Sequence, residues 1–115
     1  MNRYRNTALS STDVQAIQCG TAGLNIRGFN IINPNSTDVY VKFYDALADN
    51  VTVGTTTPIL TLLVPANGSV FEAYEVNKVV AFFGTAITLA AVTGLADSST
   101  TAPSTGVHVS FQYSV

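Results

Sequence analysis

Short runs of strand-type alternation recur along this chain at a spacing of roughly ten residues, with turn signals between them. The pattern is clearest over residues 107–115, where valine and aromatic side chains alternate with polar ones. A period of two places successive side chains on opposite faces of a strand. No segment has a convincing helical period. The sequence therefore predicts an all-β protein, an antiparallel β-sandwich or barrel with about six to eight strands.

Two unlike strands are expected near the middle of the chain. Residues 39–44 alternate, so the aliphatic set should point inward and the other set toward water or a partner. The inward set is Val39, Val41 and Phe43, and the outward set is Tyr40, Lys42 and Tyr44. Residues 59–64 are apolar on both faces apart from Thr61, which is typical of a strand covered on both sides. Further strands are expected over residues 24–32, 51–53, 70–76 and 107–115.

Residues 79–96 form an uncharged stretch of eighteen residues, close to the shortest length that spans a membrane as a helix. Its glycines and threonines lower both hydrophobicity and helix propensity. Because the surrounding chain has a β pattern, we expect two buried strands, over residues 78–83 and 86–92. A membrane helix and a buried helix are the alternatives. Residues 93–106 are rich in Ser, Thr, Gly and Pro and predict a long loop.

The first 23 residues carry isolated apolar side chains without a sustained period. Ser11-Thr12-Asp13 could cap a short helix, but Gly20 and Gly23 would end it at once. We expect an extended arm or a short strand here. The predicted organisation is an N-terminal arm over residues 1–23 and a single β-sandwich domain over residues 24–115.

Charge is scarce in this chain: 10% of the residues are charged and the formal net charge is −2. So few charges favour a component of an oligomer or an assembly over a solitary monomer. The basic residues are Arg3, Arg5, Arg27, Lys42 and Lys78. They form no cluster outside the first five residues, so nucleic-acid binding is disfavoured. Arg3-Tyr4-Arg5 could contact an acidic surface or could simply be a frayed or docked terminus.

The residues that usually carry catalysis or bind metals are few and separate. Cys19 and His108 are the only cysteine and histidine, which argues against a metal site built on either type. Glu72 and Glu75 would lie on opposite faces of a strand, so they are not an acid–base pair. No serine lies in a Gly-x-Ser-x-Gly motif. The sequence predicts neither an enzyme nor a cofactor.

The absence of a secretory signal pattern and of a disulfide favours synthesis in a cytoplasm. The sequons at Asn35, Asn50 and Asn67 are then interpreted as turn residues. Tyr40, Tyr44 and Tyr74 are candidates for a contact surface, for a protein partner or for a carbohydrate. A saccharide site would lie near Tyr40, Tyr44 and the 93–106 loop.

Two segments carry a family resemblance. They are Val41, Lys42, Phe43 and Tyr44, followed by Val53, Gly54, Thr55, Thr57, Pro58, Val64 and Pro65. In these residues the chain resembles small structural proteins of tailed bacteriophages, of the capsid decoration (cement) type. The resemblance implies a jelly-roll-like β-sandwich and a virion protein on the capsid surface, made in the host cytoplasm. It also implies the major capsid protein as partner and a homo-oligomer, preferably a trimer, without nucleic acid or membrane.

The resemblance implies a mechanical role, in which the N-terminal arm crosses neighbouring capsid subunits and the sandwich covers their junction. The candidate interface residues are Arg3, Tyr4, Arg5, Tyr40, Lys42, Tyr44 and Tyr74. The alternative function is a receptor- or carbohydrate-binding module of a head or tail fibre.

Overall fold

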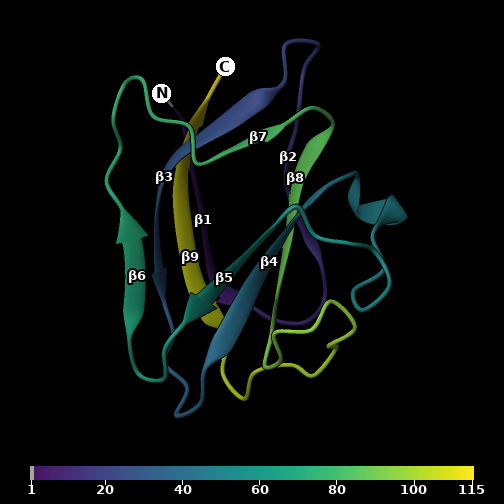
Figure 1. Ribbon diagram of the computed structural model, residues 1–115, viewed down its shortest axis with the longest axis vertical. Coiled ribbons are helices and arrows are strands. Elements are labelled where there is room, and N and C mark those ends of the chain that lie inside the picture. Colours follow the sequence, from purple (N-terminus) through teal and green to yellow (C-terminus); the bar gives the residue numbers. More distant parts are fainter. Residues whose placement is uncertain (1) are drawn as a thin grey trace.

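The computed structural model describes residues 2–115, which form two antiparallel sheets packed face to face (Figure 1). One sheet, sheet A, has the strand order β1-β9-β3-β6, with β7 also paired to β3. The other, sheet B, has the order β2-β8-β4-β5. The strands are β1 (Asn2–Leu9), β2 (Val14–Gln18), β3 (Leu24–Ile32), β4 (Val39–Asp45), β5 (Leu60–Val64), β6 (Ser69–Glu72), β7 (Ala81–Phe83), β8 (Ala86–Val92) and β9 (Val107–Ser114). A single 3-10 turn, η1 (Ala48–Asn50), follows β4 within the described chain.

The pairing is that of a long hairpin wrapped into two sheets. The first strand pairs with the last (β1 with β9), the second with β8, the third with β6 and β7, and β4 with β5. The bonds of β3 with β9 and of β4 with β8 then join these pairs into sheets A and B. This order is a jelly roll, so the predicted fold class is confirmed.

The core lies between the sheets, where aromatic rings from both layers meet. The ring centroid of Phe111 on β9 lies 5.1 Å from the ring centroid of Tyr4 and 6.2 Å from that of Phe43 on β4. The ring centroids of Phe43 and Phe83 are 6.4 Å apart. Aliphatic residues of β3, β4, β8 and β9 surround these rings and are almost fully buried. The rings therefore tie the first, middle and last strands into one core.

Residues 2–18 do not form an arm, and that part of the predicted organisation is wrong. They form β1 and β2, which pair with β9 and β8 and so complete one edge of each sheet. Leu9 is fully buried in the core. Few apolar residues are enough to hold β1 and β2 in the sheets, because both are outermost strands with one neighbour each.

The prediction for the two middle strands is reversed in the structure. β4 is buried on both faces from Val41 to Tyr44, whereas β5 is the outermost strand of sheet B. Ile59, just before β5, is 50% exposed and Leu63 is 49% exposed. The loop that follows β4 and the distant 93–106 loop cover the outer face of β4, so its polar face does not reach solvent.

The uncharged stretch forms two strands, as expected. β8 is buried along its whole length and has the predicted bounds, whereas β7 is shorter than predicted. The membrane-helix alternative is wrong, because this stretch is not helical, and no helix within residues 2–115 is long and apolar enough to cross a membrane. Residues 51–53 lie in the loop after η1 and do not form the expected short strand, and the strand expected over 70–76 ends at Glu72.

Candidate functional site

The outer face of sheet B is closed by two loops. One follows β4 and contains η1 and Gly54, and the other is the predicted 93–106 loop. They meet at Gly54, whose φ of +92° suits glycine and where an added Cβ would lie 2.4 Å from Thr100 and 3.2 Å from the Ser98 carbonyl oxygen. This close approach lets the loops cover β4 and β8.

Lys42 and Tyr44 lie under this cover and are fully buried. The Lys42 ammonium donates a hydrogen bond to the backbone carbonyl of Ala96, and burial lowers the pKa of Lys42, although the Asp97 carboxylate opposes the shift. Burial also raises the pKa of Tyr44, and the charges of Asp13 and Asp97 add to that effect. The prediction that Lys42 and Tyr44 face water or a partner is therefore wrong. A saccharide site built on Tyr44 is closed for the same reason.

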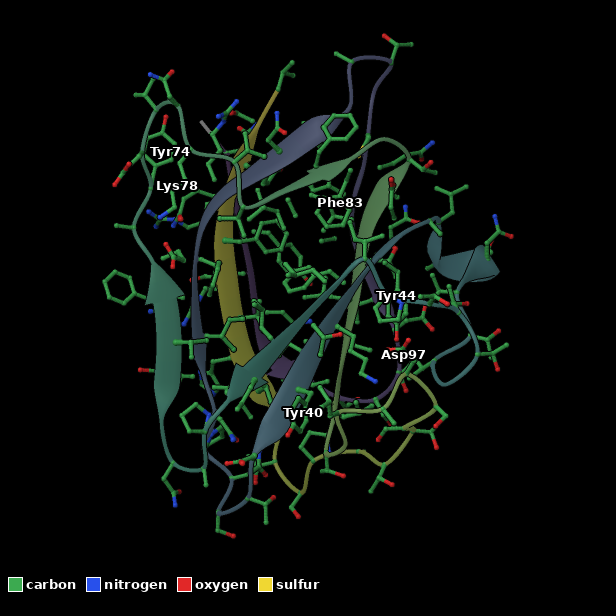
Figure 2. The ribbon with its side chains drawn as sticks, viewed as in Figure 1. Tyr40, Tyr44, Tyr74, Lys78, Phe83 and Asp97 are labelled. Atoms are coloured by element: carbon green, nitrogen blue, oxygen red, sulfur yellow. The ribbon has the colours of Figure 1, made fainter. Side chains whose placement is uncertain are left out.

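The remaining predicted interface residues do not form one surface. Tyr40 is half-buried beside Leu63 on sheet B, whereas Tyr74 lies in the loop between β6 and β7 and is 39% exposed. Figure 2 shows Tyr74 beside Lys78 and well separated from Tyr40. Tyr4 packs inward on Phe111, and Arg3 and Arg5 point outward from the exposed face of β1. The tyrosines and the arginines thus lie in separate regions of the molecule and do not form a common interface.

Exposed apolar side chains, which the sequence did not indicate, are concentrated in the segment of the chain that contains β5, β6 and β7. Of the ten strongly exposed large apolar side chains in the described chain, seven lie between residues 59 and 82. We call this set the apolar edge: Ile59, Leu63, Phe71, Tyr74, Val76, Val79 and Phe82. Residues 65–68 connect β5 to β6, so β5 ends and β6 begins at the same corner of the molecule (Figure 1).

A second feature lies on the outer face of sheet A, where side chains from β1, β9 and β3 enclose a cleft of about 210 Å³. Its outward-facing lining is Arg5, His108, Ser110, Asn30 and Ile32. Arg5 is opposite Ser110, which is opposite Asn30, while His108 is opposite Ile32. Sequence reasoning placed His108 on an exposed strand face, but it did not bring His108 and Arg5 together. That proximity depends on the pairing of the first strand with the last.

Residues that might ligate a metal are dispersed. Within residues 2–115, no three His, Cys, Asp or Glu side chains gather in a way that could hold a metal ion. Cys19 is half-buried, and burial raises the pKa of its thiol, with the charge of Asp45 adding to the shift.

Comparisons with known proteins give little for this chain. No family model matches it, and no curated protein is similar to it in sequence. Among solved structures, the crystal structure of PirA is similar with a TM-score of 0.46 and 11% sequence identity, over 96% of this chain and 90% of that chain. Similarity at this level carries no information about function.

Proposed function

We propose that this protein is a non-enzymatic structural component of a tailed-phage virion, a decoration protein that binds over capsid subunit junctions and stabilises the head. The resemblance of residues 41–44 and 53–65 to such proteins supports the assignment, and the jelly-roll fold is one that viral capsid proteins use. The partners are the major capsid protein and further copies of this chain, preferably in a trimer.

The apolar edge is the observation that carries this proposal. Phe71 and Val76 are 69% and 72% exposed, and Leu63 lies on a strand that has no charged residue. Edge strands of lone soluble proteins are usually protected by charges, proline or bulges, because their unpaired backbone groups invite another chain. A concentrated apolar surface of this kind marks a protein contact. The 10% content of charged residues fits a chain whose surface is partly covered by neighbours.

This arrangement changes the proposed mechanism of attachment. Because β1 and β2 are part of the sheets, residues 1–23 are not available to cross neighbouring subunits. The apolar edge takes that role and covers the junction. Association then stabilises the shell because the bound state buries area that the separated subunits expose.

Co-sedimentation tests the proposal. Purified protein is mixed with heads assembled from the major capsid protein that the same genome encodes, and the pelleted fraction is measured against protein concentration. We expect saturable binding and heads that resist heating to a higher temperature. A folded protein that stays in the supernatant at every concentration would contradict the proposal.

A further inference from the structure

The cleft on sheet A combines three kinds of chemistry in adjacent strands. One row across the sheet runs from Arg5 through Ser110 and Asn30 to Phe71, and the next row places His108 beside Ile32. Three strand spacings of about 4.8 Å separate the ends of the first row, or about 14 Å. The cleft between them is concave and small, about 210 Å³.

The three strands that line the cleft carry basic residues and no carboxylate, whereas Glu72 on the neighbouring strand β6 is paired with Lys78. β1, β3 and β9 contain Arg3, Arg5, Arg27 and His108 but no Asp or Glu, although the whole chain has a net charge of −2. Arg27 is committed to structure: its guanidinium donates to Ser114 Oγ at 2.6 Å and to three backbone carbonyls. Within residues 2–115, no hydrogen bond or ion pair holds the Arg5 side chain. The guanidinium N–H groups of Arg5 are therefore available to donate hydrogen bonds to an anion.

Neutral polar groups and apolar side chains complete the cleft. The Asn30 side-chain amide makes no hydrogen bond within the described chain, and the Ser110 hydroxyl makes only a long one, 3.4 Å to the Asn30 backbone carbonyl. Beside them, Ile32 lines the cleft and is 45% exposed, and Phe71, outside the cleft on the same face of the sheet, is 69% exposed. A ligand here meets a cation, then amide and hydroxyl groups, then an apolar platform.

We propose that this cleft binds an acidic saccharide. The sugar carboxylate is held by Arg5, with His108 as a neighbouring donor, and ring hydroxyls bond to Asn30 and Ser110. The apolar face of a second ring packs over Ile32 and Phe71. This site does not rest on the role in a phage head, and it lies away from Tyr40 and Tyr44.

The shape and charge of the cleft favour this ligand over a macromolecular surface. A stable protein contact buries more than about 1,000 Å², whereas this cleft has a volume of only about 210 Å³ and suits a small ligand. A nucleic-acid backbone needs several phosphate contacts, but only Arg3 and Arg5 are uncommitted cations on these strands.

The test compares two acidic saccharides, sialyllactose and digalacturonate, with their neutral counterparts lactose and digalactose, by NMR titration of the full chain. We expect the backbone amides of Arg5, Asn30, His108 and Ser110 to shift with at least one acidic probe and with neither neutral probe. Arg5→Gln should weaken binding about tenfold or more, because a charge-assisted hydrogen bond is lost.

Arg3→Gln is the matched control, since Arg3 lies on the same face of the same strand but outside the cleft. We expect it to change affinity less than about twofold. Unchanged thermal midpoints establish that both variants fold. The proposal is overturned if acidic and neutral probes bind alike, if Arg5→Gln binds like the wild type, or if neither acidic probe shifts these amides at about 10 mM, near the weak limit of specific binding.

Discussion

The carboxylate of Asp45 fixes the tight turn between β7 and β8. It accepts hydrogen bonds from the backbone N–H groups of Gly84 at 3.0 Å, Thr85 at 2.8 Å and Ala86 at 3.3 Å. Burial alone would raise the pKa of Asp45, but these donors outweigh it and hold the pKa below its ordinary value. Because the folded-state pKa is lowered, this stabilisation is present above the unfolded-state pKa. It is lost as the pH falls through the folded-state pKa.

Asp45→Asn should lower the free energy of unfolding by about 1–2 kcal/mol at about pH 7, because neutral acceptors bond these donors more weakly. The difference from wild type should shrink steadily as the pH is lowered from about 7 to about 2.5. Urea unfolding at several pH values measures it. Asp49→Asn is the control, because Asp49 is exposed in η1 and its carboxylate accepts no hydrogen bond within residues 2–115. A loss independent of pH would exclude the charge as the cause.

Two buried asparagines join three loops at the other end of the sandwich. Asn33 donates to the carbonyls of Thr37 and Val64 at 2.9 and 3.1 Å and accepts from the side chain of Asn35 at 2.9 Å. Asn35 also exchanges two hydrogen bonds with the backbone of Thr105, at 2.7 and 2.9 Å. The sequon at Asn35 is therefore a structural turn residue, as the sequence suggested.

Asn35→Ala should cost about 1–3 kcal/mol of unfolding free energy, since it leaves the Thr105 amide and carbonyl without their partner. Chemical unfolding at neutral pH measures the loss. Asn50→Ala, at an exposed position in η1, should change stability by less than about 0.5 kcal/mol. Equal stability of the two variants would mean that the Asn35 network is dispensable.

At the scale of elements, β1 and β2 are required for the fold. β1 pairs with β9 from Asn2 to Leu9, and β2 pairs with β8, so each covers an edge of a buried strand. Deletion of residues 1–20 should therefore leave the chain unfolded or aggregated, because β8 and β9 each lose one of their two neighbouring strands and Leu9 leaves the core. Far-UV circular dichroism and NMR dispersion measure this. A monodisperse, well-dispersed truncated protein would show that these strands are accessory.

The strand positions were largely predictable from the sequence, because alternation and turn residues are local. Val107–Ser114 and Ala86–Val92 match the expected segments closely. The exposure of strands was not predictable in the same way. Residues 39–44 and 59–64 exchanged roles because two loops cover β4 and leave β5 at the edge; the loops meet at Gly54 and Ser98, which are more than forty residues apart in the chain. The residue pattern of a strand does not indicate which other segments cover its outer face.

The candidate surfaces were missed for a related reason. Arg5 and His108 lie about a hundred residues apart in the chain and meet only because the jelly roll pairs its first strand with its last. Lys42 and Tyr44 carried the right alternation for an exposed face but lie beneath loops. Only the outward direction of Arg3 and Arg5 could be anticipated from residue type.

At the scale of the whole molecule, loops close the outer face of sheet B, the basic cleft lies on the outer face of sheet A, and the apolar edge follows β5, β6 and β7. We infer that copies of this chain associate through β5, an edge strand without a charged residue. Wild type should associate at micromolar concentrations, and Leu63→Glu should be monomeric, because a charge on an edge strand opposes the burial of its neighbours. Sedimentation velocity over a concentration series measures this self-association.

Thr7→Glu adds the same charge to exposed β1 at the opposite edge and should associate like wild type. If Leu63→Glu also associates like wild type, or if wild type stays monomeric up to about 1 mM, the apolar edge does not join copies of this chain.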